Sequence, residues 1–203
     1  MMSRGQALLL LAGVALLTGG LVGPENVMVL SAQPVGPYIE AHLSGDDTGA
    51  VLLPLTPACV AIAQPETWVA WVQRGFPGRL EAGGEACEAA GILDLAAWRD
   101  RRPRPEAGPL PRATARFELL HRDGRRLLLR GRFQLASLVG MPFGEDLVAV
   151  VADDDRCKNA VTRRVGSLEY RSSGRNAFVL IVGGQRCPVL GFARPPPPVR
   201  DAP

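Results

Sequence analysis

Frequent glycine and proline divide this chain into short apolar runs, and this spacing restricts its fold more than any other feature. Its 203 residues include 23 glycines and 18 prolines, which interrupt helices and favour turns. The apolar runs between them are too short for long helices but have the length of β-strands. The strand candidates are residues 38–43, 50–55, 147–152, 176–182 and 187–192.

The clearest local signal is a β-hairpin over residues 113–136. Asp123 and Gly124 separate two strand-like runs, and both residue types accept the positive φ angles that tight hairpin turns need. Apolar and charged residues alternate in the first run, as they do in a half-buried strand. We therefore expect the turn at Asp123 and Gly124.

Two segments favour a helix. Residues 64–75 fit a short helix with Pro65 in its first turn, which would place Trp68 and Trp71 on one face as core anchors or, alternatively, as a stacking platform for sugars. Residues 85–98 also favour a helix. The expected fold class is α+β and β-rich: a small antiparallel sheet or partly open barrel with one or two short helices, stabilised by disulfides.

The first twenty residues have the layout of a secretory signal. A single charge at Arg4 precedes an apolar run at residues 7–17, and small residues follow up to Gly20. Either the segment is cleaved after Gly20, or it stays as a short membrane anchor that extends to Gly23. Both alternatives predict an exported protein, periplasmic or extracellular, which in the second case is held in the membrane by its N-terminal helix.

The cysteines support the prediction of export, because an even number of widely spaced cysteines is typical of disulfide-bonded exported proteins. The chain contains Cys59, Cys87, Cys157 and Cys187, without a C-x-x-C pair, and this disfavours zinc. Of the three possible connectivities, Cys59 with Cys87 and Cys157 with Cys187 close the shortest loops. We expect these two disulfides, with buried free thiols as the alternative. The flanking residues of the two pairs are not similar, so we identify no internal repeat.

The chain is expected to have three parts. Residues 1–20 are the signal peptide or anchor, and residues 33–193 form a single exported globular domain. Residues 194–203, which contain four consecutive prolines, form a disordered tail.

Charge is distributed unevenly within the globular domain. An acidic part (33–98) is followed by a loop rich in proline and arginine (99–111) and by a basic, β-rich part (112–193). Residues 21–98 contain two basic and nine acidic side chains, whereas the chain from 99 onward contains 20 basic and 11 acidic ones. The two halves can neutralise each other, or the basic half can bind an anionic partner.

The arginines are most concentrated around the predicted hairpin. Residues 99–132 contain eleven arginines and four acids, and Arg122, Arg125 and Arg126 surround the turn, where they cannot all be buried. Export separates the protein from nucleic acid. The candidate partners of this basic surface are therefore an anionic lipid headgroup, an acidic polysaccharide or an acidic protein.

Catalytic and cofactor signatures are missing from the sequence. It contains no nucleophile elbow, P-loop or dinucleotide-binding motif, and His42 and His121 lie outside any metal-ligand or nucleophile motif. We expect no cofactor and no enzymatic activity. The one candidate metal site is Asp153 with Asp155, after a buried strand, where carboxylates could hold a divalent cation or form a solvated acidic turn.

Three functions follow from these features. The leading one is an exported, non-enzymatic binding or accessory module with a basic surface for an anionic partner. The second is a single-pass accessory subunit of a membrane protein complex, whose N-terminal helix packs on partner helices. The third is a small metal-dependent hydrolase or transferase that uses Asp153 and Asp155.

Overall fold

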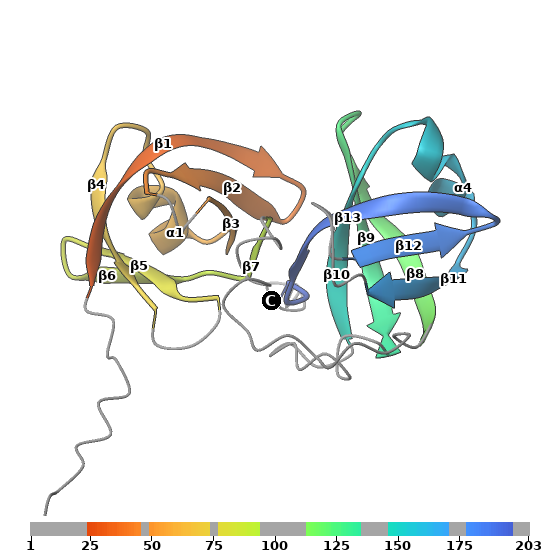
Figure 1. The fold of residues 1–203 in the computed structure, drawn as a ribbon. Coiled ribbons are helices and arrows are strands. Elements are labelled where there is room, and N and C mark those ends of the chain that lie inside the picture. Colours follow the sequence, from red (N-terminus) through yellow and green to blue (C-terminus); the bar gives the residue numbers. More distant parts are fainter. Residues whose placement is uncertain are drawn as a thin grey trace, which may run out of the picture.

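The computed structural model describes residues 24–45, 49–73, 77–93, 113–134, 146–170 and 178–196. These residues form two β-barrel halves that lie side by side (Figure 1). The expected signal segment at 1–20, the loop at 99–111 and the tail beyond residue 196 lie outside the described residues. No described helix is long and apolar enough to cross a membrane.

The second half is a closed, six-stranded antiparallel barrel. Its strands neighbour one another in the order β8-β9-β10-β13-β12-β11, and β11 pairs back to β8. The strands are β8 (Ala113–Arg122), β9 (Arg126–Phe133), β10 (Asp146–Ala152), β11 (Val165–Tyr170), β12 (Phe178–Val182) and β13 (Gln185–Ala193). The inward-facing residues form one apolar core. In this core Phe192 packs edge-on against Phe178, with 5.1 Å between ring centroids, a favourable aromatic geometry.

The first half is built from seven strands in the order β7-β3-β2-β1-β4-β5-β6. They are β1 (Glu25–Val35), β2 (Tyr38–Leu43), β3 (Ala50–Pro54), β4 (Trp68–Val72), β5 (Arg79–Ala82), β6 (Glu85–Glu88) and β7 (Gly91–Ile92). Only Ala89 and Ala90 separate β6 from β7, and their N–H groups donate to the carbonyl oxygens of Gly78 and Leu52 at 2.9 and 2.6 Å. The β6–β7 segment thus fills the place of one strand between β5 and β3.

The two halves repeat one topology. In each, the strands lie in the order first, second, third, sixth, fifth, fourth, and the first four form a Greek key. A short helical segment follows the third strand in both halves: α1 (Pro57–Ile62) after β3, and η1 (Asp155–Cys157) with α4 (Lys158–Thr162) after β10. Our expectation of no internal repeat is therefore wrong at the level of topology.

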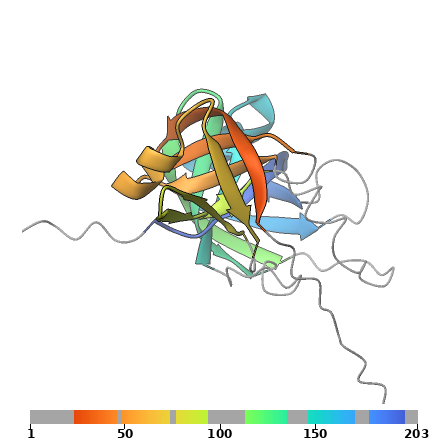
Figure 2. The same cartoon turned by 90° about the vertical axis from the view of Figure 1, so that its left-hand side faces the viewer.

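The halves are joined by strand pairing and by apolar packing. β7 pairs with both β3 and β13, so one sheet runs through the molecule. At this junction a Cβ atom on Gly91 would lie 2.0 Å from the carbonyl oxygen of Phe192, so only glycine fits. A buried cluster lies between the halves; it contains Val35, Tyr38, Leu52 and Ala90 from the first and Leu128, Val148, Val150 and Ala193 from the second. Figure 2 views the molecule from the first half, with the second behind it.

The expected fold class is confirmed: the protein is β-rich, with a barrel, short helices and a disulfide. The predicted hairpin is formed by β8 and β9. Gly124 has a φ of 81°, and the Asp123 carboxylate accepts the backbone N–H groups of Arg125 and Arg126 at 2.8 and 2.7 Å. The local sequence is therefore sufficient to specify this turn.

Both predicted helices, at 64–75 and 85–98, are wrong over the residues that the structure describes; 74–75 and 94–98 lie outside them. Residues 68–72 form β4, which pairs with β1 and β5. Trp68 is 65% exposed and Trp71 is 5% exposed, because positions three apart in a strand face opposite sides. The segment at 85–92 forms β6 and β7. In both places the neighbouring strands override a weak local helix preference.

Two further features of the first half were not predicted from the sequence. The helix α1 begins where Thr56 accepts the N–H of Cys59 at 3.3 Å and Pro57 occupies the first turn, both common at helix starts. The strand β1 begins at Glu25 and so lies largely before residue 33, where we expected the globular domain to start.

Candidate functional site

The three arginines predicted to bind an anion lie at the β8–β9 turn, but two of them bind carboxylates of this chain. Arg126 contacts the first half of the molecule, and Arg122 contacts the end of β10. Arg125 is exposed. The positive charge at the turn is therefore partly neutralised by carboxylates of the same chain.

Arg126 forms a bidentate ion pair with Glu40 of β2. Its Nη2 lies 2.6 Å from Oε1 of Glu40, and its Nη1 binds Oε2. The Glu40 side chain has no exposed surface, and that of Arg126 is 21% exposed. Burial lowers the pKa of Arg126. This pair is one instance of the charge match between the acidic and basic halves that the sequence allowed.

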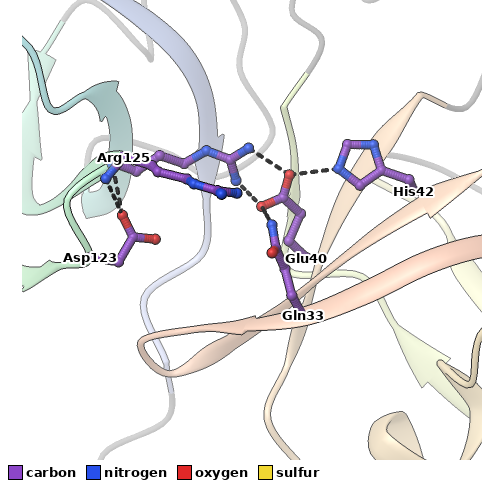
Figure 3. Close-up of polar contacts among 6 residues, drawn as sticks. Gln33, Glu40, His42, Asp123 and Arg125 are labelled. Carbon is purple, nitrogen blue, oxygen red and sulfur yellow. Dashed lines mark hydrogen bonds and ion pairs between the residues drawn. The ribbon is translucent and has the colours of Figure 1, made fainter.

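Two further side chains bind the Glu40 carboxylate. Gln33 donates from Nε2 to Oε2 at 3.1 Å, and Nε2 of His42 lies 2.8 Å from Oε1. Figure 3 shows both residues at the carboxylate. Because Glu40 is fully covered and both of its oxygens are bound, a substrate cannot reach it. The cluster of Gln33, Glu40, His42 and Arg126 therefore links the two halves through the Glu40–Arg126 ion pair.

Arg122 binds Asp153, the first residue of the acidic cluster after β10. Its Nε and Nη2 donate to the two carboxylate oxygens at 2.7 and 3.1 Å. This hydrogen bond, together with the negative charge of Asp153, raises the pKa of Arg122. The Asp153 side chain is only 8% exposed, so this carboxylate serves mainly as the partner of Arg122.

The other two aspartates of the cluster also have basic partners. Asp154 binds Arg156, and the hydrogen bond from that side chain lowers the pKa of Asp154. Oδ1 of Asp155 lies 2.9 Å from Nζ of Lys158. In the described part of the chain, no three histidine, cysteine, aspartate or glutamate side chains come together as metal ligands. The hypothesis of a metal site at Asp153 and Asp155 gains no support from this geometry.

The predicted disulfide between Cys59 and Cys87 is confirmed. It joins α1 to β6, with the two Cα atoms 5.0 Å apart. Cys157 and Cys187 are free thiols, both fully buried, and the Cys187 thiol donates to the carbonyl oxygen of Arg156, the residue before Cys157, at 3.1 Å. Their pairing as a disulfide stays a prediction.

A groove on the outer face of the second barrel gathers arginines that do not belong to the turn. It has a volume of about 550 Å³ and crosses β8, β9 and the start of β11. Its lining consists of Arg116, Phe117, Glu118, Arg130, Gly131, Arg164 and Val165. We call this surface the arginine groove. Among its described lining residues the one acid is Glu118, which lies opposite Arg130 in the β8–β9 register.

The strand pattern explains how the groove forms. Ala115 and Phe117 face the barrel core, so Arg116 and Glu118 point outward. Arg116 pairs in register with Val165 of β11, and this brings the neighbouring Arg164 to the same edge. Val165 is 57% exposed and gives the groove an apolar border.

The arginines of the groove lack ion-pair partners within the described part of the chain. Arg116, Arg130 and Arg164 are exposed, and none of them forms an ion pair with a described residue. The Arg164 side chain donates from Nη1 to the backbone carbonyl oxygen of Val161 at 3.2 Å. Sequence analysis counted Arg116 and Arg130 in the basic stretch but missed Arg164, because only strand pairing brings it near them.

Three comparisons with known proteins give the same result. No protein-family model, curated protein or solved structure matches this chain.

Proposed function

We propose that the protein is a non-enzymatic binding module that holds an anionic partner in the arginine groove. The observation that carries this proposal is the presence of three exposed arginines around one groove, none of them in an ion pair with a described residue, with Glu118 as the one acid among the described lining residues. Like charges this close repel one another at physiological salt, where the screening length is about 8 Å. An anion in the groove would relieve that repulsion.

The groove suits an anion better than the turn does. Arg122 and Arg126 already bind Asp153 and Glu40, so an external anion would have to displace these carboxylates. Guanidinium groups bind phosphate, sulfate and carboxylate oxygens through paired hydrogen bonds. The exposed Val165 at the border can contact an apolar part of the same partner.

We further propose that this module works outside the cytoplasm. The Cys59–Cys87 disulfide supports this location, because disulfides persist mainly in oxidising compartments. The signal-type segment at residues 1–20 supports it from the sequence. The partners available there are acidic polysaccharides, anionic lipid headgroups and acidic proteins.

The test measures retention of the full chain on heparin and, separately, on vesicles with and without anionic lipid. Binding should be present at low salt and should fall steeply as salt rises. The double variant Arg116→Glu, Arg130→Glu should abolish it, whereas the matched control Arg125→Glu, an exposed arginine on the same hairpin, should retain most of it. Thermal unfolding checks that both variants are folded.

Three outcomes are informative. Retention on heparin alone identifies a polysaccharide, whereas retention on anionic vesicles alone identifies a lipid surface. No retention of the intact protein on either one at low salt would reject the proposal.

A further inference from the structure

The two pairs of cysteines occupy equivalent places in the two barrels. Cys59 lies in α1, which follows the third strand of the first half, and Cys157 ends η1, which follows the third strand of the second. Cys87 lies in β6, within the segment that fills the sixth position of the first half, and Cys187 lies in β13, the sixth strand of the second. The repeated topology thus brings each pair together in the same way.

The segment that carries Cys157 is fixed on β13 by hydrogen bonds on both sides of the cysteine. Gln185 donates from Nε2 to the carbonyl oxygen of Asp155 at 3.0 Å and accepts the backbone N–H of Asn159 at 2.8 Å. The thiol of Cys187 points to the same segment, 3.1 Å from the carbonyl oxygen of Arg156. Both cysteines have no exposed surface, so in the folded protein neither thiol is open to a reaction partner from solution.

The protonation state of Cys157 disfavours other roles for the pair. The hydrogen bond with Cys187 and burial raise the pKa of Cys157 well above its usual range. Nucleophilic attack and metal binding both require a thiolate, and this folded site disfavours it. A cross-link formed during folding, while the thiols are still accessible, avoids this restriction.

We propose that Cys157 and Cys187 form a second disulfide, the counterpart of Cys59–Cys87 in the other barrel. The oxidant is a low-molecular-weight disulfide such as oxidised glutathione. One cysteine thiolate attacks it and releases one glutathione thiol, and the second cysteine then attacks the mixed disulfide and releases the other. Two electrons pass to glutathione, and the two thiol protons end on the released glutathione. This inference does not depend on the arginine groove.

The experiment uses the full chain, refolded with oxidised and reduced glutathione. Free thiols are then counted in denaturant, and the disulfides are mapped from peptides under non-reducing conditions. We expect no free thiol, one peptide pair joining Cys157 to Cys187 and one joining Cys59 to Cys87. Two free thiols, or a link between the two barrels, would overturn the proposal.

Two double variants separate the pairs. Cys157→Ser with Cys187→Ser should keep the Cys59–Cys87 link and lose the thermal stabilisation that oxidation gives to the second barrel. Cys59→Ser with Cys87→Ser should keep the Cys157–Cys187 link. If either variant fails to fold, the peptide map of the natural chain still decides the question.

Discussion

Glu40 and Arg126 connect the two barrels through an ion pair whose carboxylate has no exposed surface. A carboxylate in such a place is stable only while its charge is compensated and its oxygens are bound. The residues are 86 positions apart, so the pair forms only when both halves have folded and docked. It therefore contributes to the relative orientation of the barrels.

Removing Arg126 should destabilise the protein strongly. In Arg126→Met the Glu40 carboxylate stays buried with only Gln33 and His42 as partners, and we expect a loss of about 3–5 kcal/mol in the free energy of unfolding. Urea denaturation measures it. The control Arg125→Met alters the exposed neighbouring arginine and should change stability by no more than about 0.5 kcal/mol. Equal midpoints for the two variants would show that the pair does not hold the halves together.

The turn between β8 and β9 should depend on the residue at position 124. Gly124 has a φ of 81°, a region that a β-branched residue resists, so Gly124→Val should cost about 1 kcal/mol or more. Gly124→Asn is the matched control, because asparagine tolerates positive φ. We expect the asparagine variant to unfold at a higher denaturant concentration than the valine variant; the reverse order would contradict the assigned turn.

The Cys59–Cys87 disulfide should stabilise the first half through the unfolded chain. A bridge that closes a sequence separation of 28 residues is worth roughly 3–4 kcal/mol on the chain-entropy model. Replacing both cysteines by alanine should remove this stabilisation, and calorimetry should show it as a lower melting temperature. Addition of a reductant should then have a smaller effect on this variant than on the natural chain.

Acid should lower the stability that the Asp154 side chain gives to the first turn of η1. The hydrogen bond from Arg156 lowers the pKa of Asp154 below its ordinary value of 3.8. A carboxyl whose folded pKa is depressed contributes stability above the unfolded pKa and loses it as the pH falls through the folded pKa. Asp154→Asn keeps a helix-capping side chain but removes this titration. Its unfolding free energy should therefore fall less between neutral and strongly acidic pH than that of the natural chain, and an unchanged pH dependence would contradict the assignment.

Sequence predicted those parts of the fold whose signals are local. Asp123 and Gly124 specify their turn, and the apolar runs that became β10 and β13 each supply a buried strand. The prediction of a helix at Trp68 and Trp71 was wrong because this segment forms β4, which is stabilised by pairing with β1 and β5, and these strands lie elsewhere in the chain. The repeated topology was not visible because it preserves strand order and cysteine position but not the flanking residues.

The candidate site was less predictable than the fold. The count of arginines located the basic region, but it could not show that Arg126 binds Glu40 or that Arg122 binds Asp153. Both partners come from distant strands, and only the three-dimensional structure brings them to the turn. Arg164 joins Arg116 for the same reason, through the pairing of β11 with β8.

The last strand of the chain also completes the molecule. β13 pairs with β10 and β12 to close the second barrel and with β7 to attach that barrel to the first. During synthesis, the ribosome must therefore release the chain as far as β13 before either contact can form. A truncation just before Gln185 removes one strand from the sequence, yet it opens the second barrel and breaks the continuous sheet between the halves.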